Sequence, residues 1–289
     1  MSIYGIDVCS YQGSIDWAKV KKAGCGFAVL KCIMKGLGPD TAFSRNVRGC
    51  AAQNIPVGVY TYVYENSVSG AVKRSQAAVA ACKAQGLKGC TIWWDVEDKS
   101  IRKPAKKAQL TESILAAKKV VEAAGYGFGV YCDIDFYKSC LSPKDIGGKW
   151  WIASYGGNYP TQFGFAPGRL KPGITTELCG WQYCSRGKVP GISGNVDLDI
   201  AYDDDFTTIV GKTTVDGIPV VQRTVANKYG ANLRELPSGE SKVSTEVRKG
   251  TVLDVAEDWT ATNTVGTATD YVCVHYGGKW LWCAKKLLG

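Results

Sequence analysis

The sequence has few of the residues and patterns that mark several common functional classes. It contains a single histidine, His275, and none of its 12 cysteines forms a C-x-x-C pair. Histidine-containing zinc sites and Cys-His nucleophile pairs are therefore disfavoured, because Cys273 would share a strand with His275 rather than meet it in a pocket. No run of about 18 apolar residues is present, so no membrane-spanning helix is expected.

The beginning of the sequence, MSIYGIDVCS, lacks the features of a secretory signal. Such a signal has a basic segment followed by an apolar one, and neither is found here. We therefore expect that the protein either is made without a leader or has lost one. Without a leader, it would reach the outside of the cytoplasm only after release from the cell.

The cysteines are numerous, but they are not expected to form a disulfide framework. A chain of 289 residues can bury a core without such crosslinks. Most of the cysteines lie in or beside apolar, strand-like runs, as Cys25, Cys32, Cys90 and Cys132 do. We therefore predict that they are small buried side chains.

The composition is that of a folded protein with an excess of positive charge. Hydrophobic residues make up 45% of the chain and charged residues 21%, and the formal net charge is +9. The length favours one large domain and a small one. The charge favours a polyanionic partner, which could be nucleic acid, an acidic membrane surface or an anionic cell wall, and it does not choose among them.

The stretch GCTIWWDVED, residues 89–98, combines an apolar run with three carboxylates. In a strand, Asp95 and Glu97 would share one face, while Val96 and Asp98 would point the opposite way. Two acids held side by side at a buried strand end raise the pKa of one of them, as a general acid needs. A strand end whose carboxylates face solvent or nearby lysines would have the same sequence, because so short a motif is not specific.

Strand-like and helix-like segments alternate through the first two thirds of the chain. The expected strands are residues 3–8, 27–33, 56–64, 91–94, 128–132, 150–155, 178–183 and 195–200, and the expected helices are 14–23, 40–53, 67–85 and 111–125. This alternation predicts a parallel sheet with right-handed crossovers. Eight strands could close into a barrel, and the last third should be irregular because Gly- and Pro-rich stretches replace helices there.

Polar residues gather at the predicted ends of these strands, where such barrels carry their function. They are Asp7, Tyr62, Asp95, Glu97, Tyr131, Tyr155 and Asp197.

The remainder of the chain has a different texture. Residues 206–221 are polar and poor in pattern, and they are predicted to be a linker that follows a domain of residues 1–205. Residues 222–289 contain short β-rich runs separated by turn residues such as Pro237, Gly239 and Gly277. This pattern predicts a small all-β barrel.

Six motifs of the first domain, in order, resemble those of glycoside hydrolase family 25, the lysozymes of the Chalaropsis type. They are GIDVCSYQGSIDW, GVYTYVY, WWDVED, WWIASY, GWQY and GISGNVDLD. The resemblance covers roughly residues 1–205 and implies an irregular TIM-like β/α barrel. The segments ANLRELPSGESKV, RKGTVLDV and GGKWLWC are similar to a bacterial SH3-like domain, a kind of module that commonly binds peptidoglycan. The pairing of the two resembles phage endolysins.

The family resemblance implies a muramidase that cleaves the β-1,4 bond between N-acetylmuramic acid and N-acetylglucosamine. Carried over by position, Glu97 would protonate the leaving oxygen with Asp95 as its partner, and Asp7 and Asp197 would complete the site. Asp199 is a rival to Asp197, because the two share a strand face. The sequence departs from the family at Cys9, where serine is usual, and at Asp133, an added acid that could alter nearby pKa values or contact substrate.

Other side chains are candidates for binding the glycan. Tyr62, Tyr155 and Trp181 could stack on sugar rings, or could pack inside the barrel. Lys31, at the end of the second strand, could pair with one of the acids. Neither a metal nor an organic cofactor is called for.

The resemblance makes bacterial peptidoglycan the expected partner, with anionic wall polymers as a second candidate and nucleic acid not expected. Two rival functions remain open. The barrel could have lost its activity and serve only to bind the wall, although all four acids are retained. It could also cleave chitin-like chains, since that chemistry shares the acetamido requirement.

Overall fold

The chain divides into two units, Met1–Val210 and Gly211–Gly289. The computed structural model describes residues 2–156, 160–166, 168, 171–203, 206, 213–215, 218–263 and 269–289. Half of the predicted linker, residues 206–221, lies outside the described residues.

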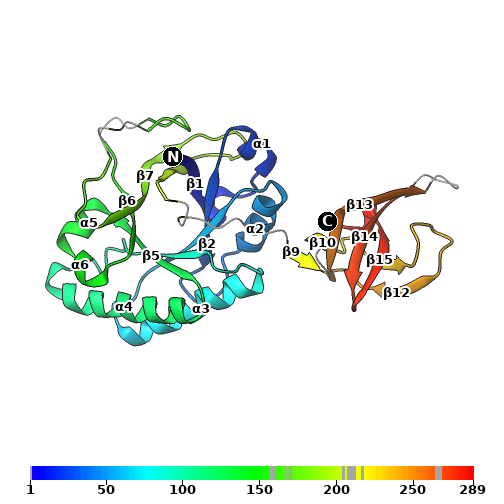
Figure 1. Ribbon diagram of the computed structural model, residues 1–289, viewed down its shortest axis with the longest axis horizontal. Coiled ribbons are helices and arrows are strands. Elements are labelled where there is room, and N and C mark those ends of the chain that lie inside the picture. The colour runs from blue at the N-terminus through cyan, green and yellow to red at the C-terminus, as the bar shows by residue number, and fades with distance from the viewer. Residues whose placement is uncertain are drawn as a thin grey trace. The chain divides into compact units, whose positions relative to one another are not determined.

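The first unit is a closed barrel of eight strands that neighbour one another in chain order (Figure 1). The strands are β1 (Ile3–Val8), β2 (Phe27–Ile33), β3 (Val57–Tyr62), β4 (Thr91–Asp95), β5 (Gly127–Asp133), β6 (Lys149–Ala153), β7 (Glu177–Gly187) and β8 (Val196–Ala201). The helices are α1 (Trp17–Lys22), α2 (Phe43–Ala52), α3 (Val68–Ala84), α4 (Lys107–Ala123), α5 (Ile134–Ser139) and α6 (Pro143–Ile146). The α/β barrel predicted from the alternating pattern is therefore confirmed.

The direction of the last strand differs from the prediction. Strands β1 to β7 run parallel to one another, whereas β8 is antiparallel to both β7 and β1. No α-helix among the described residues separates β7 from β8. A short connection can join only antiparallel neighbours, since a parallel return needs a long crossover. The barrel is thus irregular in its last third, but the expectation of an all-parallel sheet is wrong for β8.

The barrel interior is filled by large aromatic side chains that face glycines on other strands. Trp93 is fully buried, and its register partner on β5 is Gly129. A Cβ atom at Gly129 would lie 2.3 Å from the Trp93 ring, and one at Gly180 would lie 2.1 Å from Phe206. Any larger residue at these two positions would collide with the ring, because interiors are close-packed. These rings fill the barrel interior, and the polar side chains that line the pocket lie towards the strand ends.

The outer face of the barrel packs against the helices through a second set of buried apolar residues. This core cluster includes Ile6, Leu30, Val59, Ile92, Trp94, Val130, Ile152 and Leu198 from the strands, with Val47, Val79, Ile114 and Val121 from the helices. All 12 cysteines of the chain are free and buried, as predicted; ten lie in the first unit, and Cys273 and Cys283 lie in the core of the second. No helix in the described part of the chain is both long and apolar enough to cross a membrane.

The second unit is built from seven strands in the order β12-β11-β15-β14-β13-β10-β9. They are β9 (Thr213–Val215), β10 (Ile218–Thr224), β11 (Ala231–Arg234), β12 (Val243–Val247), β13 (Val252–Asn263), β14 (Thr269–Tyr276) and β15 (Lys279–Ala284). Its core gathers Val225, Leu233, Leu253, Val274, Leu281 and Cys283. The all-β character was predicted, whereas β9 and the start of β10 lie where only a linker was expected.

Candidate active site

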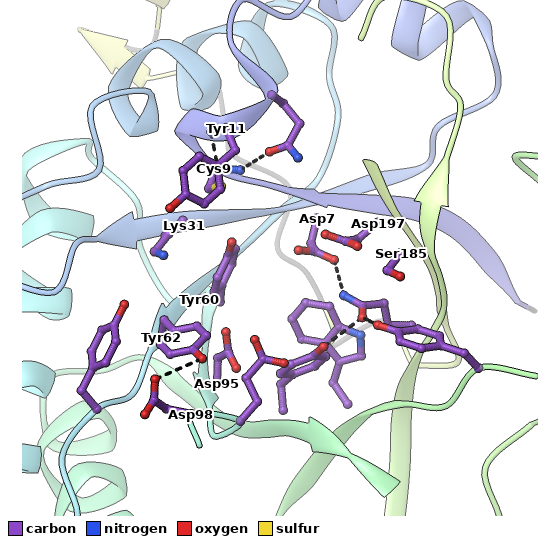
Figure 2. A pocket seen from close by; sticks show the side chains of 17 residues that line it. Asp7, Cys9, Tyr11, Lys31, Tyr60, Tyr62, Asp95, Asp98, Ser185 and Asp197 are labelled. Atoms are coloured by element: carbon purple, nitrogen blue, oxygen red, sulfur yellow. Dashed lines mark hydrogen bonds between the residues drawn. The ribbon is translucent and has the colours of Figure 1, made fainter. Parts of the chain in front are cut away.

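A pocket of about 500 Å³ opens at the end of the barrel where β1 to β6 terminate (Figure 2). Its acidic lining residues are Asp7, Asp95, Glu97, Asp98 and Asp197, and its tyrosines are Tyr11, Tyr60, Tyr62, Tyr64, Tyr131 and Tyr155. Cys9, Gln12, Lys31, Trp151, Gln182 and Ser185 complete it. Eight strands bring these residues together from both halves of the first unit.

Asp7 and Asp197 meet because β1 and β8 are neighbours in the closed barrel. The two residues are register partners in the antiparallel pairing of these strands. Asp197 lies at the start of β8, not at the end as predicted, and the reversed direction of β8 places it at the same rim. Asp199 is one step further into the barrel, where it is fully buried and accepts a 2.9 Å hydrogen bond from Nε1 of Trp151. Asp197 therefore lines the pocket, and Asp199 lies beneath it.

The opposite wall carries the acidic stretch that follows β4. Backbone hydrogen bonds hold this stretch between neighbouring strands: Val63 donates to the carbonyl of Asp95 at 2.9 Å, and Val96 donates to Tyr131 at 2.8 Å. Asp95 and Glu97 both line the pocket, as expected from their shared face.

Asp98 also lines the pocket, contrary to the expectation that it would point away. Strand β4 ends at Asp95, so the alternation of faces no longer applies three residues later. The Asp98 carboxylate accepts hydrogen bonds from the backbone N–H of Ser100 at 2.8 Å and from the Tyr62 hydroxyl at 3.4 Å. The Ser100 hydroxyl also donates to this carboxylate, at 2.5 Å, and this bond is the main cause that lowers the pKa of Asp98, which is ionised at neutral pH.

Burial raises the pKa of both Asp95 and Glu97. For Asp95, which is 4% exposed, desolvation is the larger cause and the charge of Glu97 adds to it. For Glu97, desolvation is followed by the negative charge of Asp133, while the charges of Arg102 and Lys31 act in the opposite direction. Both carboxyl groups therefore hold a proton more tightly than exposed ones do. The arrangement can supply a general acid.

The carboxyl groups on the β1 and β8 side are also poor acids. Burial, followed by the charge of Asp7, raises the pKa of Asp197 to about 9. Burial and the charge of Asp199 raise the pKa of Asp7 well above its usual range. Both groups therefore release their protons less readily than exposed aspartates do.

Lys31 extends into the pocket from β2. Its ammonium lies 5.4 Å from the ring centroid of Tyr62 and 5.9 Å from that of Tyr60. Among the described residues, no carboxylate approaches Lys31 closely enough to form the predicted ion pair. Its charge nevertheless lowers the pKa of Asp95 and of Glu97 against the larger effect of burial.

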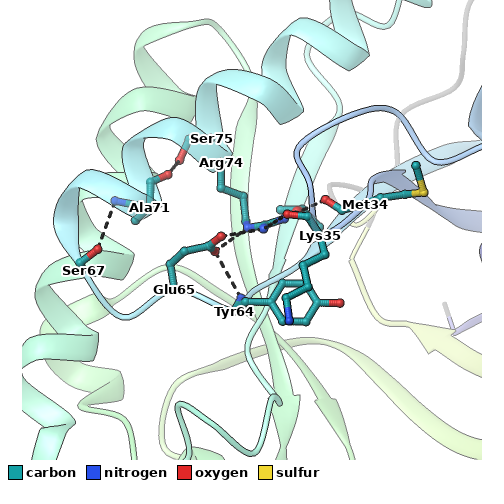
Figure 3. Close-up of polar contacts among 10 residues, drawn as sticks. Met34, Lys35, Tyr64, Glu65, Ser67, Ala71, Arg74 and Ser75 are labelled. Atoms are coloured by element: carbon teal, nitrogen blue, oxygen red, sulfur yellow. Dashed lines mark hydrogen bonds and ion pairs between the residues drawn. The ribbon is translucent and has the colours of Figure 1, made fainter.

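A fully buried arginine outside the pocket supports the wall that carries the tyrosines (Figure 3). Arg74 on α3 donates two hydrogen bonds to the Glu65 carboxylate, at 2.6 and 2.7 Å. It also donates to the carbonyls of Met34 at 3.4 Å and Lys35 at 3.2 Å. Arg74 thereby holds the segment after β2 against the segment after β3. Tyr62, the last residue of β3, and Tyr64, which follows it, both line the pocket.

Asp133, the added acid, is held away from the pocket lining. It caps α5 by accepting hydrogen bonds from the N–H groups of Asp135 and Phe136, and it forms a salt bridge with Arg102. Its effect on the site is electrostatic, through the pKa of Glu97. Cys9, the other departure, is buried, and its sulfur accepts a hydrogen bond from the backbone of Tyr11.

A comparison of the sequence with models of protein families finds a family of glycoside hydrolases, whose chemistry fits a pocket lined by acids. The model of "Glycosyl hydrolases family 25" matches residues 6–192, which is more than half of the chain. The chain belongs to this family. It is therefore a glycoside hydrolase, and the pocket lined by acids at the end of the barrel is its candidate active site.

Proteins similar to this chain match it over different lengths. An "Autolytic lysozyme" from Clostridium acetobutylicum is 25% identical over 91% of this chain and 78% of its own length. The structure of the autolysin LytC from Streptococcus pneumoniae "in complex with synthetic peptidoglycan ligand" superimposes with a TM-score of 0.59 at 23% identity over 70% of this chain, which spans 47% of that one. The spore cortex lytic enzyme SleM of Clostridium perfringens gives a TM-score of 0.57 at 17% identity, with 96% of this chain and 95% of that chain covered.

The family 25 barrel excludes one predicted glycan-binding residue from the pocket. Tyr62 and Tyr155 line the pocket as predicted, but Trp181 is 1% exposed and packs on the outer face of β7. Its Nε1 donates to the carbonyl of Ser154 at 2.9 Å. The neighbouring residue in the strand, Gln182, points inward instead, and the sequence analysis did not select it.

Among the described residues, the carboxyl groups that line the pocket are not gathered closely enough to form a metal site. Within the described ranges, the side chains gathered closely enough to hold a metal ion are those of Glu177, Cys179 and Asp203. Glu177 is the first residue of β7, so this cluster begins at the opposite end of the strand from the pocket.

Proposed function

We propose that the protein is a muramidase that cleaves the β-1,4 bond between N-acetylmuramic acid and N-acetylglucosamine in bacterial peptidoglycan. The observation that carries the proposal is the placement of Glu97, a carboxyl group with a raised pKa, in a tyrosine-lined pocket opposite Asp7 and Asp197. Glycoside hydrolysis generally needs a protonated acid on one side of the bond and a second carboxylate on the other.

The residues have separate roles in this proposal. Glu97 protonates the leaving oxygen, and Asp95 keeps the pKa of Glu97 high or holds the substrate acetamido group. Asp7 and Asp197, from the opposite wall, supply the carboxylate that faces the developing positive charge of the sugar. Tyr62 and Tyr155 offer rings and hydroxyls to the glycan.

We further propose that residues 222–289 are an SH3-like domain that binds the cell wall, and that residues 1–205 form the catalytic domain. The motifs of the second unit and its small all-β core support this assignment. The wall is then the place where the enzyme acts, and anionic wall polymers could add to its attachment through the net charge of +9.

The proposed bond is tested by supplying purified peptidoglycan and, separately, chitin oligomers. We expect new reducing ends from peptidoglycan, and mass spectrometry should identify them as N-acetylmuramic acid. Cleavage of chitin oligomers at an equal or greater rate would favour a chitinase instead. Binding without any new reducing ends, in the wild type and in Glu97→Gln alike, would show an inactive wall-binding protein.

A further inference from the structure

Gln182 lies at the centre of a hydrogen-bond network beneath the pocket. It is 4% exposed and lies on β7, where its register partner is Asp199. Its Nε2 donates to Oδ2 of Asp7 at 2.7 Å. Its Oε1 accepts from the hydroxyl of Tyr131 at 2.9 Å and from the hydroxyl of Tyr155. One amide thus joins β1, β5, β7 and the segment after β6.

The network fixes the direction of the amide. With both tyrosine hydroxyls donating to Oε1, the NH2 group faces Asp7. The reverse orientation would place Oε1 against a carboxylate oxygen, which repels it unless Asp7 is protonated. Two donors on Oε1 also polarise the amide and strengthen the hydrogen bond that Nε2 donates.

This hydrogen bond distinguishes Asp7 from Asp95 and Asp197, the other two aspartates of the proposed catalytic set. Among the described residues, no donor contacts the side-chain oxygens of Asp95 or Asp197, whereas Asp7 receives one from Gln182. A donor to a carboxylate stabilises its ionised form.

The surroundings of Asp7 otherwise oppose ionisation. Burial and the charge of Asp199 raise its pKa, and Gln182 is the group that lowers it. The other titratable or charged groups that face this part of the pocket are Lys31, Tyr60, Asp95, Glu97 and Asp197. An ionised Asp7 in this setting therefore depends on its one strong donor.

We propose that Gln182 is a positioning residue whose amide orients the Asp7 carboxyl group in the wall opposite Glu97 and favours its ionised form. This inference rests on the proposed function, in which Asp7 acts as the second carboxylate of the hydrolysis. In that scheme Asp7 must be charged while Glu97 retains its proton, and Gln182 separates the two states.

The first test is Gln182→Met, which conserves length and shape and removes the donor. We expect the acid limb of the kcat/KM profile on peptidoglycan to move up by about 1–2 pH units, because a hydrogen bond to a charged group is lost. At pH values below the shifted acid limb, kcat/KM should be about 10- to 100-fold lower than that of the wild type. At higher pH it should recover in part. The exposed Gln109→Met on α4 is the matched control and should leave the profile unchanged.

A second test changes the tyrosines and leaves Gln182 in place. In Tyr131→Phe with Tyr155→Phe, Oε1 loses both donors and the amide loses its fixed direction. The double variant should shift the acid limb in the same direction as Gln182→Met, and each single variant should shift it less. An unmoved acid limb in correctly folded Gln182→Met and in the double variant overturns the inference.

A third measurement does not depend on activity. In protein labelled with ¹³C at aspartate carboxyl groups, the resonance absent from Asp7→Asn identifies Asp7, and its titration midpoint can be followed by NMR. The midpoint should be higher in Gln182→Met than in the wild type. An equal midpoint overturns the inference, even if peptidoglycan is cleaved. If wild-type protein cleaves no glycan, the proposed function fails, and this midpoint still decides the role of Gln182.

Discussion

Asp197 pairs directly with Asp7 across the seam where β8 runs antiparallel to β1. Burial and then the charge of Asp7 make Asp197 costly to ionise, and they raise the pKa of Asp197 to about 9. The seam that closes the barrel therefore contains acids whose ionisation opposes folding.

The first prediction concerns the stability effect of this pair. The folded-state pKa of Asp197 lies above its unfolded value of about 3.9, so folding loses stability as pH rises from about 4 towards 9. Asp197→Asn should therefore stabilise the protein at pH 7 by about 1 kcal/mol or more, or about 2–4 °C in Tm, and should have little effect near pH 3. Thermal unfolding at both pH values checks this. A Tm gain that is the same at both pH values would contradict it.

The second prediction concerns the coupling of Asp95 and Glu97. The last proton of this pair leaves at a raised pKa because the site is buried and because the other carboxylate is nearby. In Asp95→Asn, Glu97 titrates alone and loses its proton more easily. The alkaline limb of kcat/KM should therefore move to lower pH, and the maximal rate should fall. An unchanged alkaline limb would show that the two groups are not coupled.

The third prediction concerns the ion pair of Arg74, which is buried, with Glu65, which is partly exposed. Arg74→Met leaves Glu65 without its partner and removes the bonds to Met34 and Lys35, so the free energy of unfolding should fall by about 3–5 kcal/mol. Denaturant unfolding measures this. The matched control is Lys19→Met, which breaks an exposed pair with Asp16 and should cost less than about 1 kcal/mol. Equal losses in the two variants would show that Arg74 does not have the supporting role described.

The fourth prediction separates catalysis from attachment. A fragment of residues 1–210 contains the whole barrel core and should cleave soluble glycan fragments at a rate close to that of the full chain. It should be markedly weaker on intact cells, because tethering raises the effective substrate concentration. The fragment 211–289 should bind cell walls and cleave nothing. Unchanged lysis of cells by the first fragment, with no binding by the second, would refute the targeting role.

The strands and the four acids could be predicted because the information is local. Apolar runs of strand length ending in Asp or Glu indicate buried strands with functional ends, as at Asp7, Asp95 and Glu97. Asp197 lies instead at the start of β8, and it lines the same pocket because β8 runs in the reverse direction. Their assembly follows from closure of the barrel.

Three features depend on tertiary structure and could not be predicted in this way. The direction of β8 is set by its short connection to β7, and Asp98 turns into the pocket because β4 has already ended. Trp181 and Gln182 are adjacent in one strand, and only the strand's orientation decides which of them faces inward. Local sequence carries no signal for that choice when both faces are buried.

Turnover of purified peptidoglycan by Glu97→Gln tests the central claim most directly. The substitution conserves size and removes the transferable proton, so reducing-end release should fall by at least about 100-fold at every pH, with thermal unfolding close to that of the wild type. Asp145→Asn, on α6, is a control that should retain the wild-type rate. Release of reducing ends by folded Glu97→Gln at a rate near that of the wild type would contradict the assignment of Glu97 as the general acid.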